Sequence, residues 1–168
     1  ERDDTSRRKP TIQFDSVATR AALVEGTVTI KGVAFTRAKG QQLGFKAGKR
    51  ILANKTVITL YPRTPYFEEY LALRKKVNPK KLKFAYIDPG CYRLRLTSIT
   101  NSSGEFTFPK MKPGKYYICG ELPWYQTGTY NKYAGSGYDN YGQVNYYTPT
   151  AYRNDHMDYL EKIVEITQ

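Results

Sequence analysis

Alternating apolar and polar residues predict β-strands along most of this chain. In the clearest case, residues 97–119, a strand leads into a turn at residues 101–104, whose Asn, Ser and Gly favour turn conformations. Phe106 and Phe108 then alternate with polar residues, so we expect both rings on one face of a short strand. Pro109 is expected to end that strand because proline has no N–H group for the ladder. A Pro-Gly turn and an aromatic strand complete the pattern.

Four other segments are expected to be strands. Residues 24–31 alternate well, and residues 55–62 carry apolar side chains on both faces, which predicts a central strand. Residues 91–100 alternate as a half-exposed strand, and residues 161–166 are expected to form the last strand of the chain. Strands are therefore predicted from the first third of the chain to its end.

One segment has the pattern of a helix. Between residues 64 and 76, Thr64 caps the first turn, Pro65 fits the first helical position, and acidic residues precede basic ones along the axis. Residues 63–83 hold seven basic and two acidic residues, which is the densest positive patch in the chain. Its candidate binding residues are Arg74, Lys75, Lys76, Lys80, Lys81 and Lys83.

The chain carries the pattern T-N-x-x-G-x-F-x-F at residues 100–108 and P-G-x-Y at residues 113–116. This pattern resembles the signature of transthyretin-like, or carboxypeptidase-regulatory-like, β-sandwich domains. Residues 24–28 and 54–60 also resemble the first two strands of such domains, in the same order. The resemblance implies an all-β, transthyretin-like (prealbumin-like) sandwich of about seven strands, with the short helix inserted after the second strand. It implies no particular activity, because such sandwiches host many roles.

The resemblance extends to uncharacterised bacterial envelope proteins, and it suggests a division of the chain. Residues 1–17 are expected to be a flexible N-terminal tail, with a short strand or a docking arm at residues 11–15 as alternatives, and residues 18–168 a single sandwich domain. The domain is expected to contain the basic helical insertion 63–83 and a Tyr-rich loop at residues 121–152. The glycine-rich stretch after the first sandwich strand is expected to make hairpin turns between short strands around residues 33–35 and 43–45.

The charge and the termini limit the classes of partner. A net charge of +12 on 168 residues implies attraction to nucleic acid, an anionic envelope surface or an acidic protein, or simply a solvated basic surface. Nucleic acid is disfavoured because the basic run is not interleaved with aromatics that stack on bases. No apolar run is long enough to cross a bilayer, and the polar first ten residues do not form a signal peptide. We expect a processed protein that is periplasmic, attached to the outer membrane or secreted.

Candidate chemistry is sparse. Cys91 and Cys119 either form one disulfide in an oxidising compartment or are two buried free thiols. The single histidine, His156, has nearby carboxylates but no second histidine or cysteine cluster, so we expect no metal site and no cofactor. No serine lies in a nucleophile context, and no partner for a histidine base is apparent, so we expect no enzymatic activity.

The most unusual composition lies in residues 121–152, where aromatic residues are spaced by Gly, Asn, Gln, Thr and Ser. We interpret this segment as a long loop that packs its own tyrosines, as a strand-rich excursion, or as a binding surface in which Tyr supplies contact area and small polar residues supply hydrogen bonds. Its candidate ligand- or partner-binding residues are Trp124, Tyr125, Tyr130, Tyr133, Tyr138, Tyr141, Tyr146 and Tyr147.

Together these features favour a non-enzymatic envelope or secreted protein that binds or scaffolds another protein through the Tyr-rich segment and the basic surface. The alternative is a carbohydrate-binding module, in which Trp124 and the neighbouring tyrosines stack on sugar rings.

Overall fold

The computed structural model describes residues 6–38 and 48–167, and most of these residues lie in β-strands. The elements in chain order are β1 (Ser6–Arg8), α1 (Ser16–Ala22), β2 (Val28–Val33), β3 (Phe35–Arg37), β4 (Arg50–Leu52), β5 (Val57–Pro62), α2 (Pro65–Arg74), a 3-10 turn η1 (Pro79–Lys81), β6 (Lys83–Ala85), α3 (Pro89–Arg93), β7 (Leu96–Ile99), β8 (Glu105–Met111), β9 (Gly114–Asp139) and β10 (Gly142–Ile166).

The main sheet has four antiparallel strands in the order β10-β9-β5-β7. β5 pairs with β9 on one side and with β7 on the other, so the prediction of a central strand at residues 55–62 is confirmed. Ile58 and Leu60 point to one face of this strand, and Tyr61 points to the other. Both faces of β5 are therefore covered.

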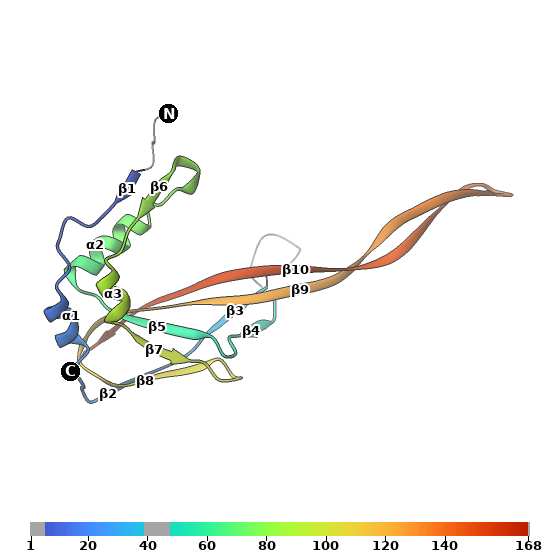
Figure 1. Cartoon of the computed structure of the whole chain (residues 1–168). Coiled ribbons are helices and arrows are strands. Elements are labelled where there is room, and N and C mark those ends of the chain that lie inside the picture. The colour runs from blue at the N-terminus through green and yellow to red at the C-terminus, as the bar shows by residue number, and fades with distance from the viewer. Residues whose placement is uncertain (1–5, 39–47, 168) are drawn as a thin grey trace.

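A second layer, the antiparallel pair β2-β8, covers the inner face of the main sheet (Figure 1). Ile30, Phe108 and Met111 of this layer pack in one buried cluster with Ile58 and Leu60 of β5. The rings of Phe106 and Phe108 lie 5.9 Å apart, as the alternation of β8 predicts. The apolar cluster between the two layers is the main core, and the prediction of an all-β fold is confirmed.

The predicted turn at residues 101–104 is also present. The Asn101 side chain accepts hydrogen bonds from the N–H groups of Ser103 and Glu105, both at 2.9 Å. Gly104 has a φ of 74°, a conformation in which a side chain would be strained. This turn joins β7 to β8 and so connects the two layers of the fold.

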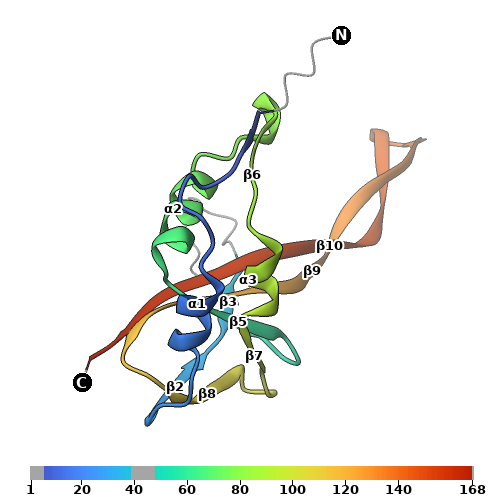
Figure 2. The same cartoon turned by 60° about the vertical axis from the view of Figure 1, so that its left-hand side comes forward.

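The outer face of the main sheet is covered by helix α2, as Figure 2 shows with α1 and α3 beside it. Thr64 caps α2 by accepting a hydrogen bond from the N–H of Phe67, as predicted. The Phe67 ring stacks on Tyr61 at a centroid distance of 5.0 Å and lies 5.6 Å from the ring of Tyr117. A second, aromatic cluster therefore lies between α2 and the sheet.

Two local predictions were wrong. β8 continues through Pro109 to Met111, because Pro109 lies at a register shift in a two-stranded sheet, where a missing N–H costs little. Residues 91–100 do not form one strand, because Asp88 caps the short helix α3 by accepting from the N–H of Gly90 at 2.7 Å. The described residues also form three α-helices and η1, where one helix was expected.

The prediction for the described part of the N-terminal tail was also wrong, and residues 1–5 of that tail lie outside the described residues. Residues 6–17 are not a free tail, because β1 pairs in parallel with β6, and Asp15 caps α1. The Glu69 carboxylate of α2 accepts hydrogen bonds from the N–H groups of Thr11 and Ile12, each at 2.9 Å. The docking-arm alternative therefore describes residues 11–15 better. The strand expected around residues 43–45 lies outside the described residues, and β3 pairs with β4.

The predicted loop at residues 121–152 is instead part of a long hairpin. β9 has 26 residues and β10 has 25, and they pair along their whole length (Figure 1). The loop interpretation was wrong because tyrosines occupy both faces of each strand, so the sequence shows no alternation of apolar and polar residues. The segment still forms strands because Tyr and Thr favour them. The last strand expected at residues 161–166 is the end of β10, and the strand-rich alternative is confirmed.

Substitution of Leu60 by Ala tests the main core. Leu60 is fully buried at 0% exposure in the core between the layers, so Leu60→Ala is expected to lower the free energy of unfolding by about 2–5 kcal/mol. Val57 lies on the same strand but is 50% exposed, so Val57→Ala is expected to cost less than about 1 kcal/mol. Urea denaturation of both variants measures the difference, and equal costs would contradict the assignment of faces on β5.

Candidate functional site

Residues 123–157 form a two-stranded ribbon, called the arm here, that extends beyond the two packed β-layers (Figure 1). Leu122 of β9 is the last buried core residue before it, and β5 pairs with β9 only as far as Gly120. The arm has two basic and two acidic residues, so its net charge is zero while the whole chain carries +12. The positive charge of this protein therefore lies outside the arm.

The inner face of the arm continues the core face of β9, and its aromatics cover one another or glycines. The rings of Trp124 and His156 stack at a centroid distance of 4.2 Å, and Tyr130 lies 6.4 Å from Tyr152. Tyr152 lies over Gly128, where a β-carbon would come within 2.6 Å of the phenol oxygen. A similar contact places Tyr146 over Gly137. These rings shield the backbone of the ribbon.

The outer face of the arm continues the face of the main sheet that α2 covers. The Arg153 guanidinium lies 4.2 Å from the centroid of the Tyr125 ring, and the Tyr133 and Tyr147 rings meet edge-on at 6.0 Å. Tyr138 shares this face by register and is 85% exposed. These tyrosines are exposed and cover no glycine in the described chain.

The eight predicted ligand residues therefore do not form one cluster. Three lie on the inner face (Trp124, Tyr130 and Tyr146), four lie on the outer face (Tyr125, Tyr133, Tyr138 and Tyr147), and Tyr141 is fully exposed at the tip. A flat ligand or partner on one face can contact only half of them.

Sequence analysis missed a cleft of about 730 Å³ at the base of the arm, between α2 and the outer face of the main sheet. We call it the aromatic cleft. Polar groups of Asn54, Lys55 and Glu121 lie among its walls, and Pro123 and Met157 join it to the outer face of the arm. Six aromatic rings line the cleft, and they come from β5, α2, α3, β9 and β10. They are Tyr61, Phe67, Tyr70, Tyr92, Tyr117 and Tyr159. The only sequence signal was the apolar character of both faces of residues 55–62.

A hydrogen-bonded network closes one side of the aromatic cleft. The Arg74 guanidinium donates to the hydroxyl of Tyr117 at 2.7 Å and to that of Tyr159 at 3.0 Å, and it lies 4.2 Å from the Tyr159 ring centroid. Tyr117 donates to the carboxylate of Glu161 at 2.7 Å. The network ties α2 to both strands at the base of the arm.

Burial controls the ionisation of this network. It raises the pKa of Tyr159 to about 12, with a contribution from the hydrogen bond to Cys119. It also raises the pKa of Tyr117, and the hydrogen bond to Glu161 raises it further. Both phenols stay neutral at physiological pH, so they offer hydrogen-bonding hydroxyls and no negative charge to a ligand.

The predicted basic patch is divided by the fold. Arg74, Lys75 and Lys76 end α2 and line a second hollow of about 690 Å³, on the side of α2 away from the aromatic cleft. Lys80 and Lys81 are exposed on η1, and Lys83 is half-buried on β6. The first three therefore line one concavity together.

The two cysteines are free and buried, so the free-thiol alternative holds in this structure. Burial raises the pKa of Cys91 to about 12 and also raises that of Cys119, which keeps both thiols protonated and unreactive. The described residues contain no group of three or more side chains suited to a metal ion. No described helix is long and apolar enough to span a membrane.

Comparison with known proteins identifies a shared fold only. No family model matches this chain, and no curated protein matches it. Among solved structures, the chain is similar to a Pseudomonas aeruginosa protein described as a putative carbohydrate binding protein. The TM-score is 0.57 and the sequence identity 19%, over 94% of this chain and 92% of that chain.

The raised pKa of Tyr159 predicts a loss of stability at alkaline pH. The unfolded chain releases this proton near the usual value of 10.0, whereas the folded chain holds it to about 12, so the free energy of unfolding should fall as the pH rises between these values. Tyr159→Phe removes the titrating group, so its stability should fall less steeply over that range. Urea denaturation at pH values below 10 and above 12 measures how steeply the free energy of unfolding falls in the wild type and in the variant. Equal pH dependence in the two proteins would contradict the prediction.

Proposed function

We propose that this chain is a non-enzymatic binding protein that binds carbohydrate in the aromatic cleft. The observation that carries the proposal is the aromatic cleft itself, in which six aromatic rings and several polar side chains line one concavity. Ligand sites in proteins are usually concave, rich in aromatic side chains and supplied with a few polar groups that orient the ligand.

The chemistry of the cleft suits a sugar ring. A sugar presents C–H groups on its faces and hydroxyl groups around its edge, so it needs flat aromatic surfaces together with donors and acceptors. The cleft has the rings of Tyr70 and Tyr92, the Lys55 ammonium as a donor, the Glu121 carboxylate as an acceptor and the Asn54 amide as both. Neutral phenols add further hydroxyl partners.

Two further observations support carbohydrate as the ligand. The structurally similar Pseudomonas aeruginosa protein is described as a putative carbohydrate binding protein. Beyond Pro123 and Met157, the outer face of the arm continues from the cleft to Tyr125. A polymeric glycan held in the cleft would extend along these residues. The proposed sugar surface is therefore the outer face, opposite Trp124.

The proposal includes the finer expectations about fold and location. The transthyretin-like signature at residues 100–116 supports a sandwich domain of that type. A non-enzymatic role is supported by the environment of His156, whose ring stacks on Trp124, and by the buried, protonated thiols. An envelope or secreted location fits a protein that meets glycans.

A second candidate function is docking of a protein partner on the arm. The specific observation is that the arm exposes tyrosines on both faces and at its tip, and it pairs with no other described strand. Tyrosine is enriched in protein interfaces, and an isolated two-stranded hairpin has little stability of its own in water. A bound protein would cover these surfaces.

Substitution of single tyrosines separates the cleft from the inner face of the arm. Tyr92 lines the cleft and is 51% exposed, so Tyr92→Ala should weaken glycan binding about two- to tenfold without unfolding the protein. Tyr130 is 50% exposed on the inner face, so Tyr130→Ala serves as the matched control and should bind normally. A glycan array followed by calorimetry on the retained glycan makes the measurement.

The proposal is wrong if no glycan is retained, or if Tyr130→Ala loses as much affinity as Tyr92→Ala.

The docking candidate has its own test. Tyr133→Ala and Tyr147→Ala together remove an exposed pair from the outer face of the arm, far from the cleft along the ribbon. A pull-down from envelope extract should lose a defined protein with this double variant and keep it with Tyr92→Ala. Retention of the same proteins by wild type and double variant would leave the arm without a docking role.

A further inference from the structure

The aromatic cleft is one of two hollows beside α2, which share a wall. The second, which we call the basic groove, is lined by the other side of α2 and by β10. Arg74, Tyr117 and Tyr159 line both hollows, so the network that closes the cleft is also the wall of the groove. A ligand chain that passes this wall contacts aromatic rings on one side and cations on the other.

The basic groove has an excess of positive charge. Five basic residues line it (Arg63, Arg74, Lys75, Lys76 and Lys162), against two acidic residues (Glu68 and Glu161). Glu161 accepts a hydrogen bond from Tyr117, and Glu68 pairs with Arg63 at 3.1 Å. Within the described chain, no ion pair neutralises the three lysines. The groove therefore offers exposed cations that have no protein partner among the described residues.

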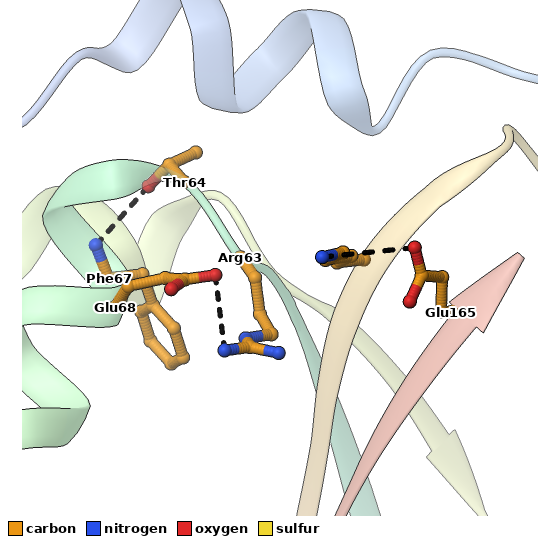
Figure 3. A network of polar contacts seen from close by, with 6 residues as sticks. Arg63, Thr64, Phe67, Glu68 and Glu165 are labelled. Carbon is orange, nitrogen blue, oxygen red and sulfur yellow. Dashed lines mark hydrogen bonds and ion pairs between the residues drawn. The ribbon is translucent and has the colours of Figure 1, made fainter.

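Arg63 is held at the start of α2, as Figure 3 shows. Its backbone N–H donates to the carbonyl of Lys115 at 2.9 Å, and its guanidinium points to Glu68. Its Nε is buried and has no hydrogen-bond partner among the described residues. Because this atom is not exposed, the cations that are open to a ligand in the groove are those of the exposed Lys75, Lys76 and Lys162.

We infer that the ligand is an acidic glycan, whose sugar rings lie in the aromatic cleft and whose carboxylate or sulfate groups lie in the basic groove. This inference rests on the proposed function and adds the charge of the ligand to it. The net charge of +12 would draw such a polyanion to the protein, and the local excess of cations would fix its position.

The probes are two pairs of polymers that differ in charge. Polygalacturonate is compared with its fully methyl-esterified form, and dextran sulfate with neutral dextran. The anionic member of at least one pair should bind more tightly than its neutral partner, and its affinity should fall as salt rises from about 0.05 M to about 0.5 M because screening weakens exposed ion pairs. Calorimetry on the folded full chain measures these affinities.

A matched pair of variants separates local charge from overall charge. Lys75→Gln with Lys76→Gln removes two charges from the groove, and Lys80→Gln with Lys81→Gln removes two charges a few residues away on η1. All four lysines are exposed, so both variants should fold. The groove variant should weaken binding of the anionic polymer about three- to tenfold, and the control less than about twofold.

Three results would overturn the inference. In the first, the anionic and neutral members of both pairs bind with equal affinity. In the second, the two double variants lose equal affinity for the anionic polymer. In the third, polyglutamate and single-stranded oligonucleotides bind as tightly as the anionic glycan. In the first case the proposed function still holds if the Tyr92→Ala variant binds the neutral polymer more weakly than the wild type does. If no polymer binds at all, the proposed function fails as well.

Discussion

The pairing of β9 with β5 is the constraint on which the rest of this structure depends. β5 is covered on both faces, with Ile58 and Leu60 in the main core and Tyr61 in the aromatic cluster under α2. β9 is held against it from Tyr116 to Gly120 and then continues into the arm. The main core, the aromatic cleft and the arm therefore share one ladder, and a change in its register would displace all three.

This ladder also explains why the cleft lies at the base of the arm. Residues of β9 alternate, so Tyr116 and Ile118 enter the core while Tyr117 and Cys119 point outward. The outward residues need a cover, and α2 provides it with Phe67 and Arg74. Because α2 does not extend over Glu121 and Pro123, the cover is incomplete there, and the aromatic cleft remains open.

The sequence predicted those parts of the fold that depend on local signals. The central strand, the Asn101 turn and the Thr64 cap follow from patterns of a few residues, and the structure contains all three. The helix α3 was not predicted because residues 88–100 also have the pattern of a turn followed by an alternating strand. The N-terminal residues were missed because their order comes from distant partners such as Glu69.

The candidate site was less predictable, for a physical reason. The tyrosines of the arm are close together in sequence, so composition alone marks them. The rings of the aromatic cleft come from β5, α2, α3, β9 and β10, and only the folded sheet brings them together. Tyr92 and Tyr159 carry no local signal that distinguishes them from any other tyrosine in the chain. The tyrosines of the arm were therefore predictable from the sequence, whereas the rings of the aromatic cleft were not.

A β-bulge that leaves one residue of β9 unpaired determines the composition of each face near the tip of the arm. Tyr147 faces Tyr133 and Tyr146 faces Gly135, so Ala134 has no partner in the ladder. This bulge reverses the alternation of β9, and beyond it Tyr138 lies on the same face as Tyr125. Regular pairing through Ala134 would place the last tyrosine of β9 on the opposite face, whereas deletion of Ala134 would remove the bulge and leave Tyr138 on its present face. The arm can therefore differ by one residue in length at this point between otherwise similar chains and still present the same rings on each face.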